Sequence, residues 1–401
     1  MPRIRPPSAS TRDSASARDA SRAPAVRTLL GGVTAREFLA RYWQQRPLVV
    51  RAAWPGLRDP VSVSDLFRLA ARDDCESRLV ARDRGRWRLD QGPFRTAHLR
   101  AMPPRGWTLL VQGLNHLVPA ADRLLRAFRF LPYARLDDVM ASYAADGGGV
   151  GPHFDAYDVF LLQGRGRRRW RVSRQRDLAL DPRAPLKILR DFRAGAEWVL
   201  EPGDMLYLPP GVAHEGTALG PCMTYSIGFR SPAARELGVE FLAFLQDRLE
   251  LADRRYSDAG APPSRRPARI GEALVDHCAA VLDGVRWSRG DVGEFLGRYL
   301  SEPKPHVRFF RPGTPLARRA FERAAHRTGI RLAPATGMLF RGGRVYVNGE
   351  SVAASGRTRA LLRRLADERG LPGGTSVTRA AAALLYTWYR AGYLEPGGAN
   401  G

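Results

Sequence analysis

A histidine and an aspartate two residues apart, His153 and Asp155, follow a glycine run in the stretch GGGVGPHFDAYDVFLLQG, residues 147–164. Side chains at positions i and i+2 of a β-strand lie on the same face, so the imidazole and the carboxylate point the same way. The pair can supply two ligands of a metal site, because imidazole nitrogen and carboxylate oxygen both bind metals. The competing interpretation is a turn followed by an ordinary strand with a polar edge.

The third ligand of such a site is expected in a second compound pattern, EPGDMLYLPPGVAHEGTALG, residues 201–220. Gly-Asp, an apolar strand and a Pro-Pro-Gly turn lead there to His214. Two imidazoles and one carboxylate on one face of a metal form a facial iron site that leaves the other positions open. His116 is the main rival, but its setting, GLNHLVP, lacks the strand and turn. The two patterns together predict a metal site that includes His153 and Asp155.

A cation is needed beside this metal if its open positions hold a bidentate 2-oxo acid and dioxygen. The far carboxylate of the acid is best bound by the two-pronged guanidinium of arginine. In GRGRRRWRV, residues 164–172, strand alternation places Arg168 on the face of Trp170 and Arg167 and Arg169 on the other. If Trp170 faces a barrel interior, Arg168 does too. The alternative for any arginine of this run is a solvated cation.

The chain divides into four regions. Residues 1–27 are rich in Ser, Arg, Pro and Ala and predict a disordered basic tail. Residues 28–231 begin with a helix and continue as short strands between turn residues, which is typical of a sandwich, barrel or jelly roll. Residues 232–303 show helical spacing and predict a subdomain that packs on the strands or forms a dimer interface. Residues 304–396 follow the order of a winged-helix module, so the predicted class is α+β.

The composition limits the partners and the compartment. The 401 residues include 64 Lys and Arg against 40 Asp and Glu, a net charge of +24. This balance favours an RNA-rich partner, but nearly all the cations are arginines spread along the chain, as genome composition alone would produce. The three cysteines lack CxxC spacing and fit a reducing compartment. No membrane span or secretory signal is visible, so we expect a cytoplasmic protein without a membrane partner.

These segments together resemble the JmjC-type 2-oxoglutarate oxygenases of the ribosomal oxygenase group. The resemblance rests on FLARYWQQRPLVVRAA, GGGVGPHFDAYDVFLLQGRGRRRWRV, GDMLYLPPGVAHEG and YSIGFRSP, and it extends through the helical region to the winged-helix-like end. It implies a double-stranded β-helix (jelly roll) of the JmjC and cupin kind. It also implies Fe(II) as cofactor, 2-oxoglutarate and dioxygen as cosubstrates, and a homodimer formed through the helical region.

The same resemblance assigns roles to particular residues. It implies three iron ligands: His153, Asp155 and His214. It implies that Arg168 binds the distal carboxylate of 2-oxoglutarate, assisted in the family by a serine of the strand before the glycine run. The corresponding strand here is VMASYAADGGG. Its best-matched position is Ala144, with Ser142 or Tyr143 as substitutes.

The bacterial arginine hydroxylases of this group imply a substrate, an arginine of a large-subunit ribosomal protein that is hydroxylated at the β-carbon. A guanidinium should meet an acid at the mouth of the site, for which Asp146 is the first candidate and Asp158 the second. Tyr157, on the face of His153 and Asp155, could stack on the guanidinium. The alternatives are a turn-forming role for Asp146 and barrel packing for Tyr157.

Two other functions are compatible with these patterns. Histidine hydroxylation or N-methyl-lysine demethylation would use the same iron site, so the pocket must discriminate, with an aromatic cage favouring methyl-lysine. A non-enzymatic, metal-binding cupin regulator would instead bind DNA tightly and in a salt-sensitive way. Ribosomal RNA or the assembling ribosome is a further expected partner of a ribosomal oxygenase.

Overall fold

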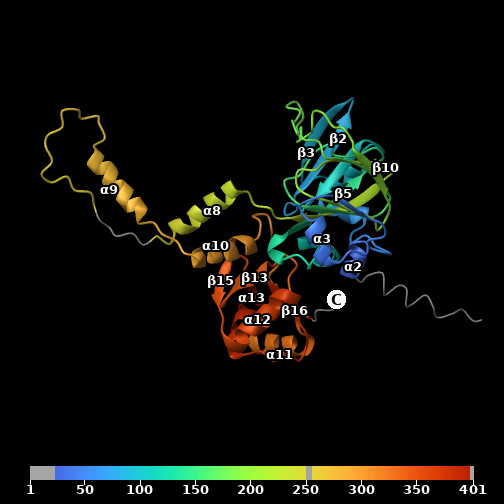
Figure 1. Cartoon of the computed structure of the whole chain (residues 1–401). Coiled ribbons are helices and arrows are strands. Elements are labelled where there is room, and N and C mark those ends of the chain that lie inside the picture. Colours follow the sequence, from blue (N-terminus) through green and yellow to red (C-terminus); the bar gives the residue numbers. More distant parts are fainter. Residues whose placement is uncertain (1–22, 250–254, 398–401) are drawn as a thin grey trace, which may run out of the picture.

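A computed structural model describes residues 23–249 and 255–397, so most of the predicted basic tail lies outside the described residues. The described part forms a strand-rich body, a helical arm and a C-terminal domain (Figure 1). Among the described helices, none is both long and apolar enough to span a membrane.

Two antiparallel sheets form the strand-rich body. The larger sheet has the strand order β1-β9-β6-β11-β5-β4-β2-β3, and the smaller has the order β10-β7-β8. The strands of the larger sheet are β1 (Leu48–Val50), β2 (Ser77–Asp83), β3 (Arg86–Gln91), β4 (Trp107–Val111), β5 (Leu136–Ala144), β6 (Val159–Gln163), β9 (Met205–Leu208) and β11 (Cys222–Phe229). Those of the smaller sheet are β7 (Arg167–Ser173), β8 (Ala196–Leu200) and β10 (Ala213–Leu219). This arrangement is the predicted double-stranded β-helix.

Strand alternation gives the larger sheet two faces with different cores. On the outer face, Phe160 and Tyr207 pack against Phe38 of the N-terminal helices. On the inner face, Leu161 and Trp170 share a core that joins the two sheets. The helices over this body are α2 (Val26–Leu29), α3 (Ala35–Arg41), α4 (Val63–Leu69), α5 (Thr96–Arg100), α6 (Leu114–Leu117), α7 (Pro119–Arg126) and the 3₁₀ turn η1 (Tyr133–Arg135). These helices cover the outer face of the larger sheet, so the inner face can hold the site.

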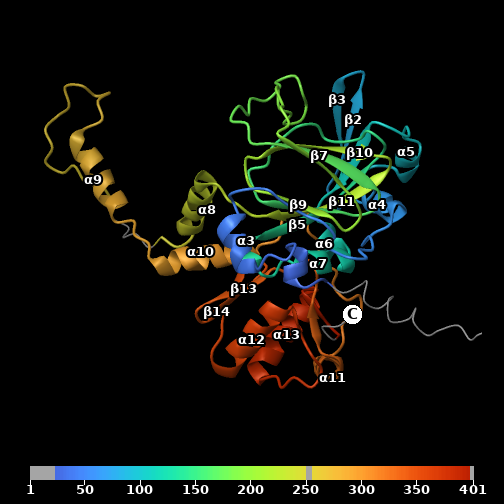
Figure 2. The same cartoon turned by 45° about the vertical axis from the view of Figure 1, so that its right-hand side comes forward.

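The chain after the barrel is helical and then mixed. Its helices are α8 (Ala234–Gln246), α9 (Glu272–Asp283), α10 (Arg289–Ser301), α11 (Arg318–Thr328), α12 (Gly356–Glu368) and α13 (Arg379–Ala391). Its strands are β12 (Ile330–Leu332), β13 (Met338–Arg341), β14 (Arg344–Val347), β15 (Glu350–Ala353), β16 (Gly370–Leu371) and β17 (Leu394–Pro396). Arg341 pairs with Arg344 across a hairpin turn at Gly342–Gly343. Figures 1 and 2 show α8 and α9 extending away from the barrel and the C-terminal domain.

Helix α10 joins the arm to the C-terminal domain. It packs against β13, β14 and β15, and its Glu294 accepts hydrogen bonds from the hydroxyls of Tyr346 (3.1 Å) and Ser351 (3.2 Å). We expected this helix within the helical region 232–303. The domain boundaries proposed from the sequence stay predictions.

Candidate active site

The structure brings the three predicted metal ligands together. The ligand atoms of His153, Asp155 and His214 all lie within 4.8 Å of one another, and His214 Nε2 is 3.7 Å from Asp155 Oδ2. His153 and His214 exchange two backbone hydrogen bonds of 2.9 and 2.8 Å. The sequence predicted a regular strand here, whereas the structure has an extended segment, bridged to β10, that bends at Ala156 and Tyr157 before β6.

Both imidazoles are oriented through Nδ1. His153 Nδ1 is 2.9 Å from the Gly151 carbonyl oxygen, and His214 Nδ1 is 2.9 Å from that of Val212. A carbonyl oxygen only accepts, so each Nδ1 carries a proton, and in this tautomer the Nε2 lone pair is left for a metal. Burial, followed by the charge of His153, lowers the pKa of His214 to about 4. His214 is thus neutral at pH 7, and this donor set fits a divalent metal such as Fe(II).

The glycine run before His153 is a close-packed segment. A Cβ atom on Gly148 would overlap the Trp107 carbonyl oxygen of β4, and a Cβ atom on Gly149 would overlap that of Gly216 on β10. Only glycine lets one backbone approach another this closely. The run therefore passes between the two sheets and delivers the imidazole to the inner face.

Arg168 lies on the inner face of β7, as predicted, and only 5% of it is exposed. Its Nη2 is 3.1 Å from Ser142 Oγ on β5, and its Cζ is 5.8 Å from the centroid of the Trp170 ring. Trp170 in turn lies 5.9 Å from the His214 ring. Among the described residues, the buried Arg168 Nε has no hydrogen-bond partner. A buried cation with an unsatisfied donor is costly unless a ligand satisfies it, so this end of the pocket suits a carboxylate.

The structure distinguishes the three candidates for the assisting side chain. Alternation along β5 turns Tyr143 to the outer core and Ser142 and Ala144 to the inner face. Ala144 has no hydroxyl and packs against Ala218. The serine hydroxyl is the group that meets Arg168.

A row of polar side chains that was not predicted from the sequence lies beside this serine. Thr224 on β11 is the cross-strand partner of both Ser142 on β5 and Gln163 on β6, and all three are buried. Thr224 Oγ1 donates a 3.0 Å hydrogen bond to Gln163 Oε1. The available signal was a polar residue at an inward position of two strands whose outward positions are apolar.

Tyr157 lies at the open side of the site. It is 42% exposed, so it does not belong to the barrel core, while its hydroxyl end is enclosed. Burial, followed by the charges of Asp155 and Asp138, raises the pKa of the Tyr157 hydroxyl. Burial and the nearby carboxylates thus disfavour the phenolate, so Tyr157 presents a neutral hydroxyl.

The Asp146 side chain contacts neighbouring turns of the barrel. Its carboxylate is 3.0 Å from Arg105 Nη2 and accepts a 2.8 Å hydrogen bond from the Gly220 backbone N–H. These contacts support the turn-forming interpretation. A role in substrate binding stays a prediction.

Asp158 does not reach the site. It is fully buried, and its carboxylate accepts hydrogen bonds from the Tyr207 hydroxyl (2.6 Å) and Gln44 Nε2 (3.1 Å) and lies 3.4 Å from Arg135. The physical reason is alternation, because Asp158 shares the outer face of Phe160. The structure therefore counts against Asp158 as a substrate contact and gives it a structural role.

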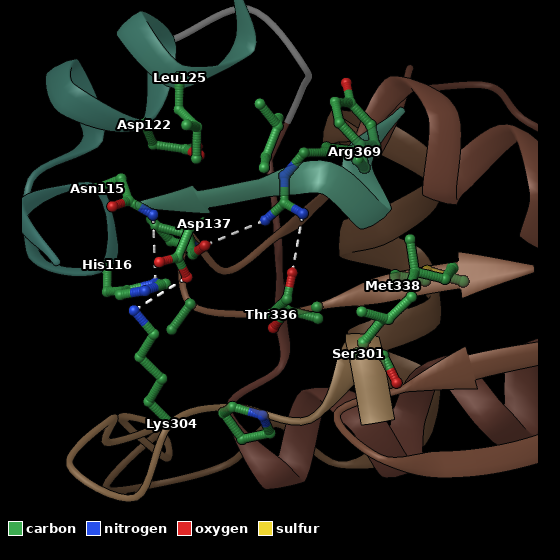
Figure 3. A pocket seen from close by; sticks show the side chains of 18 of the residues that line it. Asn115, His116, Asp122, Leu125, Asp137, Ser301, Lys304, Thr336, Met338 and Arg369 are labelled. Carbon is green, nitrogen blue, oxygen red and sulfur yellow. Dashed lines mark hydrogen bonds and ion pairs between the residues drawn. The ribbon is translucent and has the colours of Figure 1, made fainter. Parts of the chain in front are cut away.

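The rival ligand His116 lies elsewhere, in a cavity of about 100 Å³ between the barrel and the C-terminal domain (Figure 3). The same cavity is lined by Asp137 and Lys304, whose side chains form an ion pair of 2.9 Å, and by Arg369. Burial, followed by the charge of Lys304, lowers the pKa of His116 to about 4. His116 is not among the clustered ligand atoms of the described residues.

Known proteins match this chain in both domains. The family model described as JmjC domain matches residues 123–237, and the one described as ROXA-like winged helix matches residues 284–395. The "Ribosomal protein uL16 3-hydroxylase" of Escherichia coli (strain K12) is 37% identical over 325 residues, which cover 79% of this chain and 84% of that protein. The chain belongs to the JmjC-type ribosomal oxygenases.

Solved structures agree with this assignment to the ribosomal oxygenases. The X-ray structure of E. coli ycfD has a TM-score of 0.78 and 34% identity, covering 90% of this chain and 98% of that chain. YcfD in complex with cobalt and 2-oxoglutarate has a TM-score of 0.77 and 33% identity, with the same coverage. The predicted fold class is confirmed, as is the enzyme class, a metal- and 2-oxoglutarate-dependent dioxygenase.

Proposed function

We propose that this ribosomal oxygenase hydroxylates the β-carbon of an arginine side chain in the large-subunit ribosomal protein uL16. The observation that carries the proposal is the joint placement of the His-Asp-His cluster and a buried, incompletely satisfied Arg168 in one barrel interior. The name of the E. coli relative supports the substrate. Two observations support a cytoplasmic location: the proposed substrate is a ribosomal protein, and the three cysteines of the chain lack CxxC spacing.

The residue roles follow from the geometry. His153, Asp155 and His214 would hold Fe(II) through two Nε2 atoms and a carboxylate oxygen. The metal would supply the oxidation, in which dioxygen and 2-oxoglutarate give succinate, carbon dioxide and one oxygen atom for the substrate carbon. Arg168 and Ser142 would bind the distal carboxylate and so orient the cosubstrate.

We propose that the substrate side chain binds at the open side of the site, beside Tyr157. The exposed ring of Tyr157 offers a face for a guanidinium. Asp146 is proposed as an acidic contact, with part of its side chain still exposed. One exposed ring does not form the aromatic cage that would favour a methyl-lysine.

Mass spectrometry tests the proposal. The full chain is incubated with Fe(II), 2-oxoglutarate, oxygen and a peptide that carries the arginine loop of uL16. We expect a gain of one oxygen atom on arginine, lost in Asp155→Ala and kept in Asp83→Ala, which removes an exposed carboxylate of β2.

Peptides carrying histidine or N-methyl-lysine run in parallel to distinguish the other JmjC chemistries. Oxidation of one of these, with arginine untouched, would replace the proposed substrate. Unmodified peptides in the presence of succinate formation would leave the oxygenase and remove the substrate.

We further propose a homodimer formed through the helical region. Helices α8 and α9 and the following linker expose large apolar side chains: Val239 (58%), Leu242 (62%), Leu282 (68%) and Trp287 (55%). Exposed apolar area of this kind marks protein interfaces. Light scattering of the wild type should give a dimer mass, and Leu242→Glu should shift it toward the monomer while Arg235→Glu on the same helix should not. A monomeric wild type would refute this proposal.

A further inference from the structure

The positive charge of the chain is unevenly distributed. Residues 304–401 contain 17 Lys and Arg against 5 Asp and Glu, a net charge of +12, whereas residues 232–303 contain 10 against 12, a net charge of −2. Lys and Arg are about equally dense in the two regions, so the difference in net charge comes from the acids, which are few in residues 304–401. The last quarter of the chain thus holds half of the total charge of +24, which calls for a local explanation.

Helix α11 carries part of this charge as a stripe. Phe321 is its buried residue and packs on Tyr389 of α13, with ring centroids 4.7 Å apart. At 100° per residue, Arg319, Arg323 and Arg327 fall on the side away from Phe321. All three are exposed. We call these three residues the α11 stripe.

Nearby acids do not neutralise the α11 stripe. Glu322, the only acid of the helix, is 3.0 Å from Arg318, which lies outside the stripe. Two other acids of the domain also pair elsewhere, Glu395 with Arg331 and Glu368 with Arg364. No stripe residue takes part in the ion pairs found among residues 23–249 and 255–397. Like charges four residues apart destabilise a helix, so the stripe has a cost that a partner would remove.

We propose that the α11 stripe is a docking surface for the phosphate backbone of RNA. Guanidinium groups bind phosphate oxygens in pairs, and residues four apart on a helix present them about 6 Å apart along one line. RNA is favoured over other polyanions because the proposed function places the substrate in a ribosomal particle, and the inference rests on that function. Both views place α11 at the end of the C-terminal domain far from the barrel, so docking there leaves the barrel open (Figures 1 and 2).

The test measures binding of the full chain to a fluorescein-labelled RNA hairpin by anisotropy over a series of salt concentrations. The triple variant Arg319→Glu, Arg323→Glu, Arg327→Glu should weaken binding at least about tenfold and reduce the slope of log Kd against log salt by about 2 to 3. The control triple Arg36→Glu, Arg100→Glu, Arg235→Glu changes the net charge equally at exposed helical positions elsewhere. It should weaken binding no more than about twofold. Replacing the three arginines of the α11 stripe by Gln should weaken RNA binding by an amount between those of the stripe and control variants.

Each outcome decides the proposal. Equal losses in the stripe and control variants would mean that only net charge matters, and would overturn it. Full RNA affinity in the stripe variant would overturn it too, as would stripe-dependent binding to phosphatidylglycerol vesicles without RNA binding. Hydroxylation of the free uL16 peptide should be unchanged in both variants. A failure of docking is therefore separable from a failure of the hydroxylase function.

Discussion

Arg168 of the barrel and Arg323 of α11 carry the same guanidinium in opposite surroundings. Arg168 is 5% exposed, bonded to one serine hydroxyl and set beside Trp170, whereas Arg323 stands in water between two other arginines. In the interior, water cannot replace a lost partner, so a single contact has a large effect. On the surface, water and salt screen each charge, so a single arginine has a small effect and a large one requires several arginines together.

The largest effect is expected at the buried end of this comparison. Arg168→Met should raise the Kd for 2-oxoglutarate by about 150- to 5,000-fold, because removing one member of a buried charge pair costs about 3–5 kcal/mol. Calorimetric titration of the metal-loaded protein with 2-oxoglutarate measures the change.

Arg167→Met is the matched control, since Arg167 is exposed on the same strand. Its Kd for 2-oxoglutarate should stay within about twofold of the wild type, as for an exposed charge. Similar losses in both variants would mean that burial does not distinguish the two positions.

His116 lines the cavity between the barrel and the C-terminal domain, and its protonation can be tested by changing the pH. Its pKa in the folded state is about 4, below the ordinary value of 6.5, because burial and the charge of Lys304 disfavour the protonated ring. Below pH 6.5 the unfolded state therefore binds more protons than the folded state. The free energy of unfolding should fall as pH drops from 6.5 toward 4, by up to about 3 kcal/mol from this residue.

Urea unfolding of wild type and His116→Gln between pH 7 and 4 measures this contribution. The variant should lose less stability over that window than the wild type. His326→Gln, at an exposed position of α11, should follow the wild-type curve. Parallel curves for wild type and His116→Gln would show that this cavity is open to water.

Ser142 should show a smaller effect than Arg168. Loss of its hydroxyl in Ser142→Ala removes one hydrogen bond to the guanidinium, worth about 1 kcal/mol, or about a fivefold rise in the Kd for 2-oxoglutarate. Ser77→Ala is the matched control, because Ser77 is equally buried but bonds the backbone carbonyl of Ala70. It should lower stability and leave the Kd unchanged. An unchanged Kd in Ser142→Ala would remove this serine from the cosubstrate pocket.

The sequence predicted those parts of the site that depend on local spacing. The i, i+2 spacing of His153 and Asp155 and the strand-and-turn approach to His214 are local, and the three ligand atoms do come together. Alternation along one strand was also enough to turn Arg168 inward.

Contacts between distant segments were not predictable from the sequence. Asp158 was expected at the mouth, but its partners, Tyr207 and Gln44, come from segments far along the chain. Ser142 and Ala144 share the same face, so alternation could not choose between them. Only the approach of β7 to β5 across the barrel decides which of them meets the arginine.

The smallest effect concerns stability at the exposed end of the comparison. Arg323→Glu would place a carboxylate four residues from both Arg319 and Arg327, so two repulsive pairs become attractive ones. Each repulsive pair lost and each attractive pair gained is worth about 0.2–0.5 kcal/mol, near the lower value where salt screens exposed charges, so the variant should be about 1 kcal/mol more stable than the wild type in thermal unfolding. The same variant should bind the RNA hairpin more weakly. A gain in stability with a loss of binding is expected only if the charge of the stripe serves a partner, and a destabilised variant with full RNA affinity would contradict both parts.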